Sequence, residues 1–330
     1  MPDAGRLRLS GGRVIIVALL APDPHQLRKA DASDGDQDSS GGGKYRGAHA
    51  SYLPGTLALA GSDPGLYDGR EQDVAMGYHY SRWWRGLTIV VVPPLSRAIA
   101  SRDWRGMEHV PRTGGLIVAA NHISEADPLA LCYYLWASGH YPVFLAKSAL
   151  FGHGFVARVV RGTGQIPVNR DGGAAAALKP AEDALAAGQC VVVYPEGTCT
   201  RDPDLWPMTG QTGAARLALV TGTPVLPLAS WGAHELLPYR KGEKAGLADT
   251  LQPGFHPFPR KTMQVIAGPP VDLSRYEGQP LAAETLRAAT ADIMDAITLL
   301  VGQLRGQTPP AERYDHHKAI EQRRAARPPS

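Results

Sequence analysis

Short, almost wholly apolar runs alternate with helical patterns along most of the chain, and this alternation constrains the fold more than any other feature. The runs typical of buried strands are 116–120, 143–146, 165–168, 190–194, 224–228 and 262–267. Helical patterns cover 125–136, 155–161, 174–187, 213–220 and 281–304. Strands that are apolar on both faces are typical of a sheet covered by helices on both sides. The pattern therefore predicts an α/β fold with a mixed, largely parallel central sheet flanked by helices.

The overall charge and the cysteine count exclude several classes of protein. The 330 residues include 34 Lys and Arg against 31 Asp and Glu, a formal net charge of +3, which argues against a nucleic-acid partner. The three cysteines show no C-x-x-C spacing, so we expect neither a disulfide framework nor a structural zinc site. The same cysteine usage predicts a protein of a reducing compartment. None of the eleven histidines forms a clear ligand set with the cysteines, so no metal is expected.

The two ends of the chain differ from the middle in composition. Residues 23–75 are rich in Asp, Gly, Ser and Ala, and we predict that residues 1–75 are either a disordered tail or the result of a start site assigned too far upstream. The apolar run 14–21 resembles the core of a signal peptide, but it is short and lacks a clear cleavage site. The charged, proline-flanked residues 306–330 are expected to form a loose tail.

Residues 76–105 combine paired tryptophans, an apolar run and a group of arginines. Trp83 and Trp84 precede the apolar run 87–92, which is too short to cross a bilayer. One acid, Asp103, stands against five arginines in this segment: Arg82, Arg85, Arg97, Arg102 and Arg105. The combination predicts an N-terminal interfacial helical segment, with indoles at headgroup depth and guanidinium groups on anionic lipid. The alternative is a helix that packs on the protein's own core and leaves its arginines in water.

Polar residues follow directly after the first predicted strand. Asn121 and His122 come after the run 116–120, and Asp127 lies five residues beyond His122. Functional groups gather at the carboxyl ends of strands in α/β sheets, and a carboxylate that orients a histidine makes it a better general base. The spacing therefore favours a His122–Asp127 pair. The structural alternative is a helix capping box formed by Ser124 and Asp127, with His122 on a surface loop.

Two further strand ends carry charged residues. The run 190–194 leads into Glu196 and Gly197, where a carboxylate beside a glycine can hydrogen-bond the hydroxyl groups of a polyol. A turn that contains proline and glycine is the other interpretation. The run 165–168 leads to Arg170, which is either a phosphate-binding fork or an ordinary surface arginine.

Four of these motifs also form an ordered set. They are His-x4-Asp at His122 and Asp127, G-x-I-P-V-N-R ending at Arg170, Y-P-E-G-T at 194–198, and T-P-V-L-P-L at 223–228. In order and approximate spacing they resemble the four sequence blocks of the glycerolipid acyltransferase family, most of all its bacterial branch that acylates 1-acylglycerol-3-phosphate. The resemblance covers roughly residues 82–305. It implies a glycerolphosphate acyltransferase-like fold, with the acyltransferase domain over 106–305.

The resemblance also implies a reaction and a role for several residues. An acyl group would pass from acyl-CoA or acyl carrier protein to the free hydroxyl of a lysophospholipid, foremost 1-acylglycerol-3-phosphate, giving phosphatidic acid. His122 would take the hydroxyl proton, and Asp127 would orient and charge-stabilise the histidine. Direct attack fits the lack of a G-x-S-x-G motif. Acceptor-binding roles fall to Lys147, Arg170, Glu196, Gly197, Thr198 and Arg201, and an acyl-donor or structural role to Pro227.

The implied place of action is the cytoplasmic face of the cell membrane, with peripheral attachment to an anionic surface and no cofactor beyond the thioester co-substrate. The longest uncharged stretches, 128–146 and 217–234, are interrupted by polar and proline residues. We therefore expect no transmembrane helix.

The third block departs from the commonest form in the family. That form is E-G-T-R-S, but here Cys199 follows the threonine and Arg201 comes two residues later. Thr209 and Gln211 stand where basic residues are common. Fewer positive charges weaken the case for a phosphate-bearing acceptor, since a charge-assisted hydrogen bond contributes about 1.5–3 kcal/mol. Another lyso-lipid or a glycolipid acceptor, and a non-catalytic lipid-binding protein of the same fold, stay open as alternatives.

Overall fold

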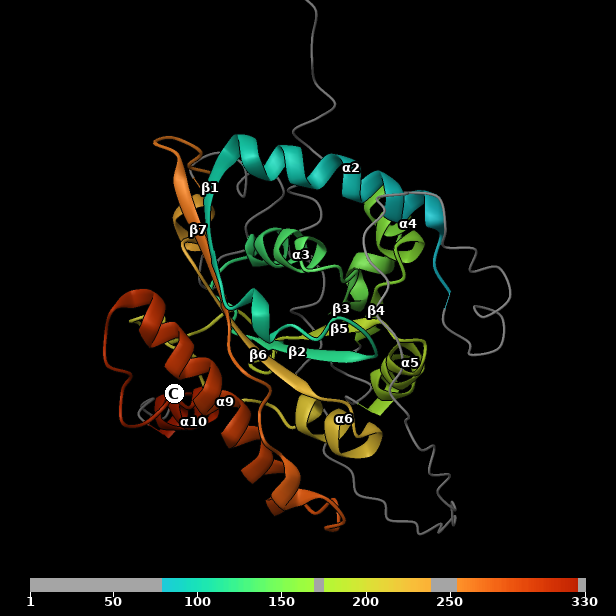
Figure 1. The fold of residues 1–330 in the computed structure, drawn as a ribbon. Coiled ribbons are helices and arrows are strands. Elements are labelled where there is room, and N and C mark those ends of the chain that lie inside the picture. Colours follow the sequence, from blue (N-terminus) through green and yellow to red (C-terminus); the bar gives the residue numbers. More distant parts are fainter. Residues whose placement is uncertain (1–78, 169–174, 239–253, 326–330) are drawn as a thin grey trace, which may run out of the picture.

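The computed structural model describes residues 79–168, 175–238 and 254–325, and a seven-stranded sheet runs through its centre (Figure 1). In chain order the strands are β1 (Ala100–Arg105), β2 (Leu116–Ala120), β3 (Pro142–Lys147), β4 (Ile166–Val168), β5 (Cys190–Val193), β6 (Val225–Trp231) and β7 (Lys261–Ala267). Their order across the sheet is β1-β7-β6-β2-β5-β3-β4. The predicted tail 1–75 lies outside the described residues.

Strand direction divides the sheet into two parts. β2 pairs in parallel with β5 and with β6, and β3 pairs in parallel with β5 and with β4. β7 runs antiparallel to β6, and β1 runs parallel to β7. The prediction of a mixed, largely parallel sheet is confirmed. Because the strands from β2 to β6 point the same way, their carboxyl ends meet at one edge, where α/β proteins place their sites.

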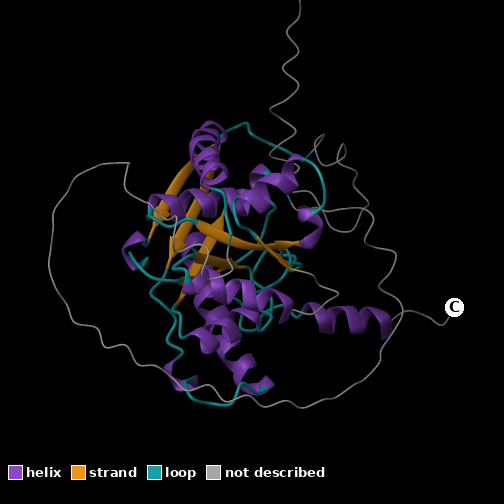
Figure 2. Ribbon diagram, turned by 90° about the vertical axis from the view of Figure 1, so that its right-hand side faces the viewer, coloured by secondary structure: helices purple, strands orange, loops and turns teal. Residues whose placement is uncertain are grey.

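Helices cover both faces of this sheet (Figures 1 and 2). They are α2 (Arg82–Ile99), α3 (Asp127–Ala137), α4 (Phe155–Gly162), α5 (Ala175–Ala186), α6 (Gly213–Thr221), α7 (Ala233–Leu236), α9 (Ala283–Arg305) and α10 (His316–Ala325). On β2, Ile117 and Ala119 pack in a core with α5, α6 and α9, whereas Leu116 and Val118 pack in a core with α3. This alternation buries the central strand on both faces and explains its unbroken apolar sequence.

The segment 76–105, predicted as one interfacial unit, has two different structures within its described part. Helix α2 lies along the outside of the domain, beyond α3 (Figure 1). Residues 100–105 then form β1, an edge strand whose pairing with β7 runs from Ala100 opposite Lys261 to Arg105 opposite Ile266. An edge strand can keep polar side chains in water, so its sequence A-S-R-D-W-R lacks the apolar pattern by which the central strands were found.

Arg85 on α2 lies inside the protein, in contrast to the lipid-facing position predicted for it. The residue is buried, and its Nε donates to the Thr163 carbonyl (3.2 Å) while Nη1 donates to Gln189 Oε1 (2.8 Å). Its guanidinium also lies 4.2 Å from the centroid of the Tyr141 ring. Neither interpretation placed this arginine in the interior, because the first put it on lipid and the alternative left it in water. Arg85 anchors α2 to the domain.

The residues after 305, expected to be a loose tail, contain helix α10. The Thr209 N–H donates to the Tyr314 carbonyl at 3.1 Å, which ties the chain before α10 to the loop before α6. Among the described residues, no helix combines the length and the apolar character that a membrane span requires.

Candidate active site

His122 and Asp127 meet at the carboxyl end of β2. Asp127 Oδ2 lies 2.9 Å from His122 Nδ1 and accepts hydrogen bonds from the N–H groups of Ile123 (2.7 Å) and Ser124 (2.9 Å). Its second oxygen, Oδ1, accepts a hydrogen bond from the Ser230 hydroxyl at 3.1 Å. Asp127 is fully buried. A carboxylate with this many fixed donors is held in one orientation, from which it can stabilise an imidazolium.

The capping interpretation of Ser124 accounts for part of the same geometry. The bond from the Ser124 N–H to Asp127 is one half of a capping box. The Ser124 hydroxyl, however, donates to the Leu237 carbonyl (2.7 Å) and accepts from the Ala126 N–H (3.0 Å). One carboxylate oxygen thus both fixes the start of α3 and contacts His122, so the two interpretations describe one structure.

The second ring nitrogen of His122 points away from Asp127. An ionised carboxylate only accepts hydrogen bonds, so Nδ1 carries the proton and Nε2 keeps its lone pair. The imidazole is stacked on the Tyr194 ring, with centroids 4.2 Å apart and planes inclined by 17°, and the His122 side chain is 13% exposed. A ring nitrogen that is oriented in this way and offers a lone pair is suited to general base catalysis.

The thiol of Cys199 lies against this nitrogen, with Sγ 3.4 Å from His122 Nε2. Burial raises the pKa of the Cys199 thiol, and the charges of Glu125 and Asp127 raise it further. The thiol therefore carries its proton and donates it in a hydrogen bond to Nε2. No local sequence signal connects Cys199 with His122. The contact arises because the loop that follows β5 crosses to the end of the neighbouring strand β2.

Glu196 points into the protein. It is 5% exposed, and its Oε1 accepts the His122 backbone N–H (2.9 Å) while Oε2 accepts the Met208 N–H (3.0 Å). Burial raises the pKa of Glu196 to about 7, although the two backbone donors act in the opposite direction. The loop is pinned a second time by the Thr200 N–H, which donates to the His122 carbonyl at 2.7 Å. In this structure Glu196 holds the loop that carries His122, a part different from the acceptor contact predicted for it.

Lys147 and Gly197, two other predicted acceptor-binding residues, lie at the ends of β3 and β5. Lys147 Nζ is 3.8 Å from Glu125 Oε1, and the lysine side chain is 42% exposed. Gly197 adopts φ +70°, a conformation that favours glycine, and its N–H closes a turn to the Tyr194 carbonyl at 2.9 Å. The turn predicted as the alternative for this motif is therefore present, and Glu196 is one of its residues.

The remaining predicted residues have varied surroundings. Thr198 and Arg201 are half-buried in the loop after β5, and Arg170 lies outside the described residues. Pro227 is buried within β6, opposite Ala119 of β2, and its carbonyl accepts the Gly268 N–H at 3.0 Å. The acyl-donor or structural role of Pro227 stays a prediction.

A clamp that sequence reasoning missed joins β2 to β6 at this edge of the sheet. The Asn121 Nδ2 donates to the Ser230 carbonyl (3.0 Å), and the Ser230 N–H donates to Asn121 Oδ1 (2.8 Å). Both residues are fully buried. Ser230 also contacts Asp127, so the clamp fixes the carboxylate relative to the sheet. Ser230 is a polar residue near the end of an apolar strand, and this position could have indicated that it belongs to the site.

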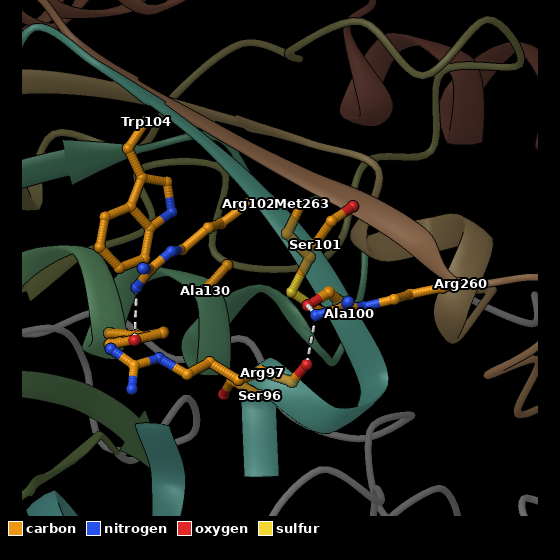
Figure 3. Close-up of a pocket in the computed structure, with 10 residues that line it drawn as sticks. Ser96, Arg97, Ala100, Ser101, Arg102, Trp104, Ala130, Arg260 and Met263 are labelled. Carbon is orange, nitrogen blue, oxygen red and sulfur yellow. Dashed lines mark hydrogen bonds between the residues drawn. The ribbon is translucent and has the colours of Figure 1, made fainter. Parts of the chain in front are cut away.

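A cavity of about 410 Å³ lies at the C-terminal end of α2 (Figure 3). Arg102 donates to the Tyr133 hydroxyl and lies 5.0 Å from the Trp104 ring centroid. Arg260 donates to the Ala100 carbonyl at 3.0 Å. No acidic residue is among those that line the cavity, which are Ser96, Arg97, Ala100, Ser101, Arg102, Trp104, Ala130, Tyr133, Arg260 and Met263. Three guanidinium groups without a carboxylate suit a phosphate or another anion.

The part of the chain that contains this site is similar to a known protein family. Residues 101–231 match the model of the Acyltransferase family. The matched range includes His122, Asp127, Cys199 and Glu196. The predicted resemblance to acyltransferases is thereby confirmed.

Two curated relatives align with parts of the chain. A 1-acyl-sn-glycerol-3-phosphate acyltransferase of Borreliella burgdorferi is 31% identical over 156 residues, which are 47% of this chain and 55% of the relative. The chloroplastic 1-acyl-sn-glycerol-3-phosphate acyltransferase BAT2 of Brassica napus is 27% identical over 139 residues, or 41% of this chain and 39% of the relative. The chain thus spans about half the length of the curated relatives it matches.

Among solved structures, the crystal structure of the 1-acyl-sn-glycerophosphate acyltransferase PlsC from Thermotoga maritima aligns with a TM-score of 0.49 and 23% sequence identity. The alignment covers 68% of this chain and 83% of that one.

Proposed function

We propose that this chain, whose residues 101–231 match the model of the Acyltransferase family, transfers an acyl group from a thioester to the free hydroxyl of a lysophospholipid. The foremost acceptor is 1-acylglycerol-3-phosphate, and the product is then phosphatidic acid. The observation that carries the proposal is the 2.9 Å contact of His122 Nδ1 with Asp127, which leaves Nε2 facing away from the carboxylate. The names of both curated relatives support this choice of acceptor.

The proposed reaction needs one proton carrier. The acceptor hydroxyl gives its proton to His122 Nε2 while its oxygen attacks the carbonyl carbon of the thioester. When the tetrahedral intermediate collapses, the C–S bond breaks and the thiolate of coenzyme A or acyl carrier protein takes the proton from the imidazolium. Asp127 stabilises the imidazolium between the two steps. The Cys199 thiol must turn away from Nε2 when the acceptor binds, because it occupies the same lone pair.

A phosphate-bearing acceptor requires positive charge beside His122. Lys147 faces Glu125, three residues from His122, at 3.8 Å, and such a partly exposed ion pair is weak enough to exchange its carboxylate for a phosphate. Arg201 follows Cys199 by two residues in the loop that contacts His122. We assign the acceptor phosphate to Lys147 and Arg201, with Arg170 as a third contact.

The proposed place of action is the anionic, cytoplasmic surface of a membrane, to which the protein attaches peripherally. Helix α2 leaves large apolar side chains exposed, namely Trp83, Ile89, Val90 and Val91. Trp83 and Val90 are seven residues apart and therefore share one face of the helix. The arginine-lined cavity at the end of the same helix can receive lipid phosphate. Apolar side chains and cationic groups on one helix are typical of an interfacial anchor.

An acceptor panel tests the proposed function. The purified protein receives one labelled acyl-CoA together with 1-acylglycerol-3-phosphate, 1-acylglycerol-3-phosphocholine or a glycolipid that has a free hydroxyl. We expect the fastest transfer to 1-acylglycerol-3-phosphate, because only this acceptor presents a phosphate monoester to Lys147 and Arg201. A second arm replaces acyl-CoA with acyl carrier protein to identify the donor.

The other outcomes of the panel decide between the alternatives. Faster transfer to the glycolipid would replace the proposed acceptor and retain the mechanism. Thiol release that stays at background with every acceptor and both donors would contradict the proposed activity and favour a lipid-binding protein.

A further inference from the structure

Three side chains of metal-ligand type lie close together beside the carboxyl end of β2. They are His122, Glu125 and Cys199, and one potential ligand atom from each lies within 4.8 Å of the others. The set combines an imidazole, a carboxylate and a thiol, the three kinds of ligand found in protein zinc sites. Sequence reasoning expected no such set, because Cys199 lies 77 residues from His122.

The spacing of the thiol and the imidazole already fits a shared metal ion. With Zn–S near 2.3 Å, Zn–N near 2.0–2.1 Å and a tetrahedral angle, the sulfur and nitrogen ligands of zinc stand about 3.5 Å apart. Cys199 Sγ and His122 Nε2 are 3.4 Å apart. Replacing the thiol proton by a metal ion therefore requires little movement of either side chain.

The partners of His122 also suit metal binding. A metal-bound histidine commonly donates its other ring N–H to a carboxylate, which fixes the tautomer and makes the ligating nitrogen more basic. His122 Nδ1 has this partner in the fully buried Asp127, at 2.9 Å. The His122 side chain is 13% exposed, which provides a route for an ion from solvent.

The third ligand has to move to complete the set. Glu125 Oε1 lies 3.8 Å from Lys147 Nζ, and its side chain is 21% exposed. A partly exposed ion pair of this kind contributes little stability, so the carboxylate can turn from Lys147 toward the metal. The fourth tetrahedral position is left to water.

We infer that His122 Nε2, Cys199 Sγ and the Glu125 carboxylate form an inhibitory site for a thiophilic divalent metal ion, with Zn²⁺ as the fitting ion. Thiolate and imidazole ligands select zinc over magnesium or calcium. When the metal binds, the Cys199 thiol loses its proton to solvent and His122 Nε2 gives its lone pair to the metal. The base then cannot accept a proton from an acceptor hydroxyl. The inhibition rests on the proposed function, whereas the metal binding does not.

A binding experiment tests the site without any reference to activity. Metal-free protein is titrated with Zn²⁺ in competition with a chromophoric chelator, and with Co²⁺ to observe the thiolate-to-cobalt charge-transfer band. Wild-type protein should bind one ion, and Cys199→Ser should weaken Zn²⁺ binding at least 10-fold and remove the band. Cys132→Ser is the matched control, because Cys132 lies on α3 outside the ligand set. Glu125→Gln should weaken binding by a smaller factor.

The results separate the binding from its consequence. Absence of one-to-one binding, or equal binding by Cys199→Ser and wild-type protein, would overturn the site. In the transfer assay, Zn²⁺ should inhibit wild-type protein, EDTA should restore its activity, and Cys199→Ser should need at least 10-fold more Zn²⁺ relative to its own metal-free rate. Binding without inhibition would overturn the inhibitory role. A metal-free protein without any transfer activity would contradict the proposed function, and the titration would still decide the metal site.

Discussion

The carboxyl edge of the sheet buries charged side chains, whereas the outer face of α2 exposes apolar ones. At the sheet edge, Asp127 is fully buried and Glu196 is 5% exposed, yet all four of their carboxylate oxygens accept hydrogen bonds from the protein. On α2, Trp83 is 65% and Val90 70% exposed, so large apolar side chains face water. A buried charge without partners is costly, and an exposed apolar patch usually marks a surface that binds something.

This difference separates a region that is complete in itself from one that needs a partner. The network around His122 has its donors and acceptors inside the domain, and such networks hold reacting groups in one geometry. Helix α2 is attached to the domain through the buried Arg85, whereas the large apolar side chains on the outer face of the helix are exposed. Mutations at the sheet edge should therefore impair chemistry or folding, and mutations on α2 should impair attachment.

Asp127→Asn should have the largest effect. An amide cannot hold Nδ1 of His122 as a charged acceptor, so the transfer rate should fall by about 10²–10⁴-fold. Initial rates with 1-acylglycerol-3-phosphate measure the loss, and circular dichroism checks the fold. Asp272→Asn, at an exposed aspartate distant in sequence, is the control and should keep the wild-type rate. A folded Asp127→Asn protein with full activity would contradict the claim that the residues at the sheet edge catalyse the transfer.

The triple variant Ile89→Ser, Val90→Ser, Val91→Ser tests the other region. Valine and serine have similar helix propensities, so α2 should persist. Losing about 1 kcal/mol of interfacial burial per side chain should weaken binding to phosphatidylglycerol-containing vesicles roughly 10²-fold. Flotation with the vesicles measures the binding. The control, Val220→Ser with Leu299→Ser, removes exposed apolar side chains from α6 and α9 and should bind as wild type. Equal loss in both variants would remove the distinction between the two faces.

Glu196 should make stability depend on pH. Burial raises its pKa from 4.5 to about 7, so between these values the folded protein binds more protons at this group than the unfolded chain does. The free energy of unfolding should therefore fall as pH rises through this window, by about 3 kcal/mol from this residue. Urea unfolding from pH 4.5 to pH 8 should show this fall for wild-type protein relative to Glu196→Gln. A constant difference between the two proteins would show that the carboxylate is not penalised by burial.

Arg102→Gln should have the smallest effect of the set. A basic residue near an anionic membrane contributes about 1 kcal/mol, so binding to anionic vesicles should weaken about 5-fold. Binding to neutral phosphatidylcholine vesicles should not change. Arg287→Gln, on the exposed side of α9, is the matched control and should leave both affinities unchanged. An equal effect of the two variants would show that the arginine-lined cavity has no specific role in membrane binding.

Much of the sheet and part of the site could be predicted because local sequence determines them. The central strands β2, β5 and β6 are apolar on both faces, and His122 and Asp127 are only five residues apart at the end of one of them. The edge strand β1 lacked that pattern.

Contacts between distant parts of the chain left no local signal. The approach of Cys199 to His122 depends on the path of the loop after β5, and the inward direction of Glu196 depends on backbone donors at residues 122 and 208. The burial of Arg85 likewise depends on acceptors at residues 163 and 189. Spacing along the chain can predict the type of residue at a strand end, but not which way its side chain turns.

The most direct test of the central claim, that His122 is the base of an acyl transfer to a lysophospholipid, is the initial rate of His122→Asn. The rate is measured with labelled acyl-CoA and 1-acylglycerol-3-phosphate beside wild-type protein and His153→Asn, an exposed histidine before α4. We predict a loss of at least about 10²-fold for His122→Asn, with an unchanged thermal unfolding profile, and full activity for His153→Asn. Transfer at the wild-type rate by folded His122→Asn would contradict the account.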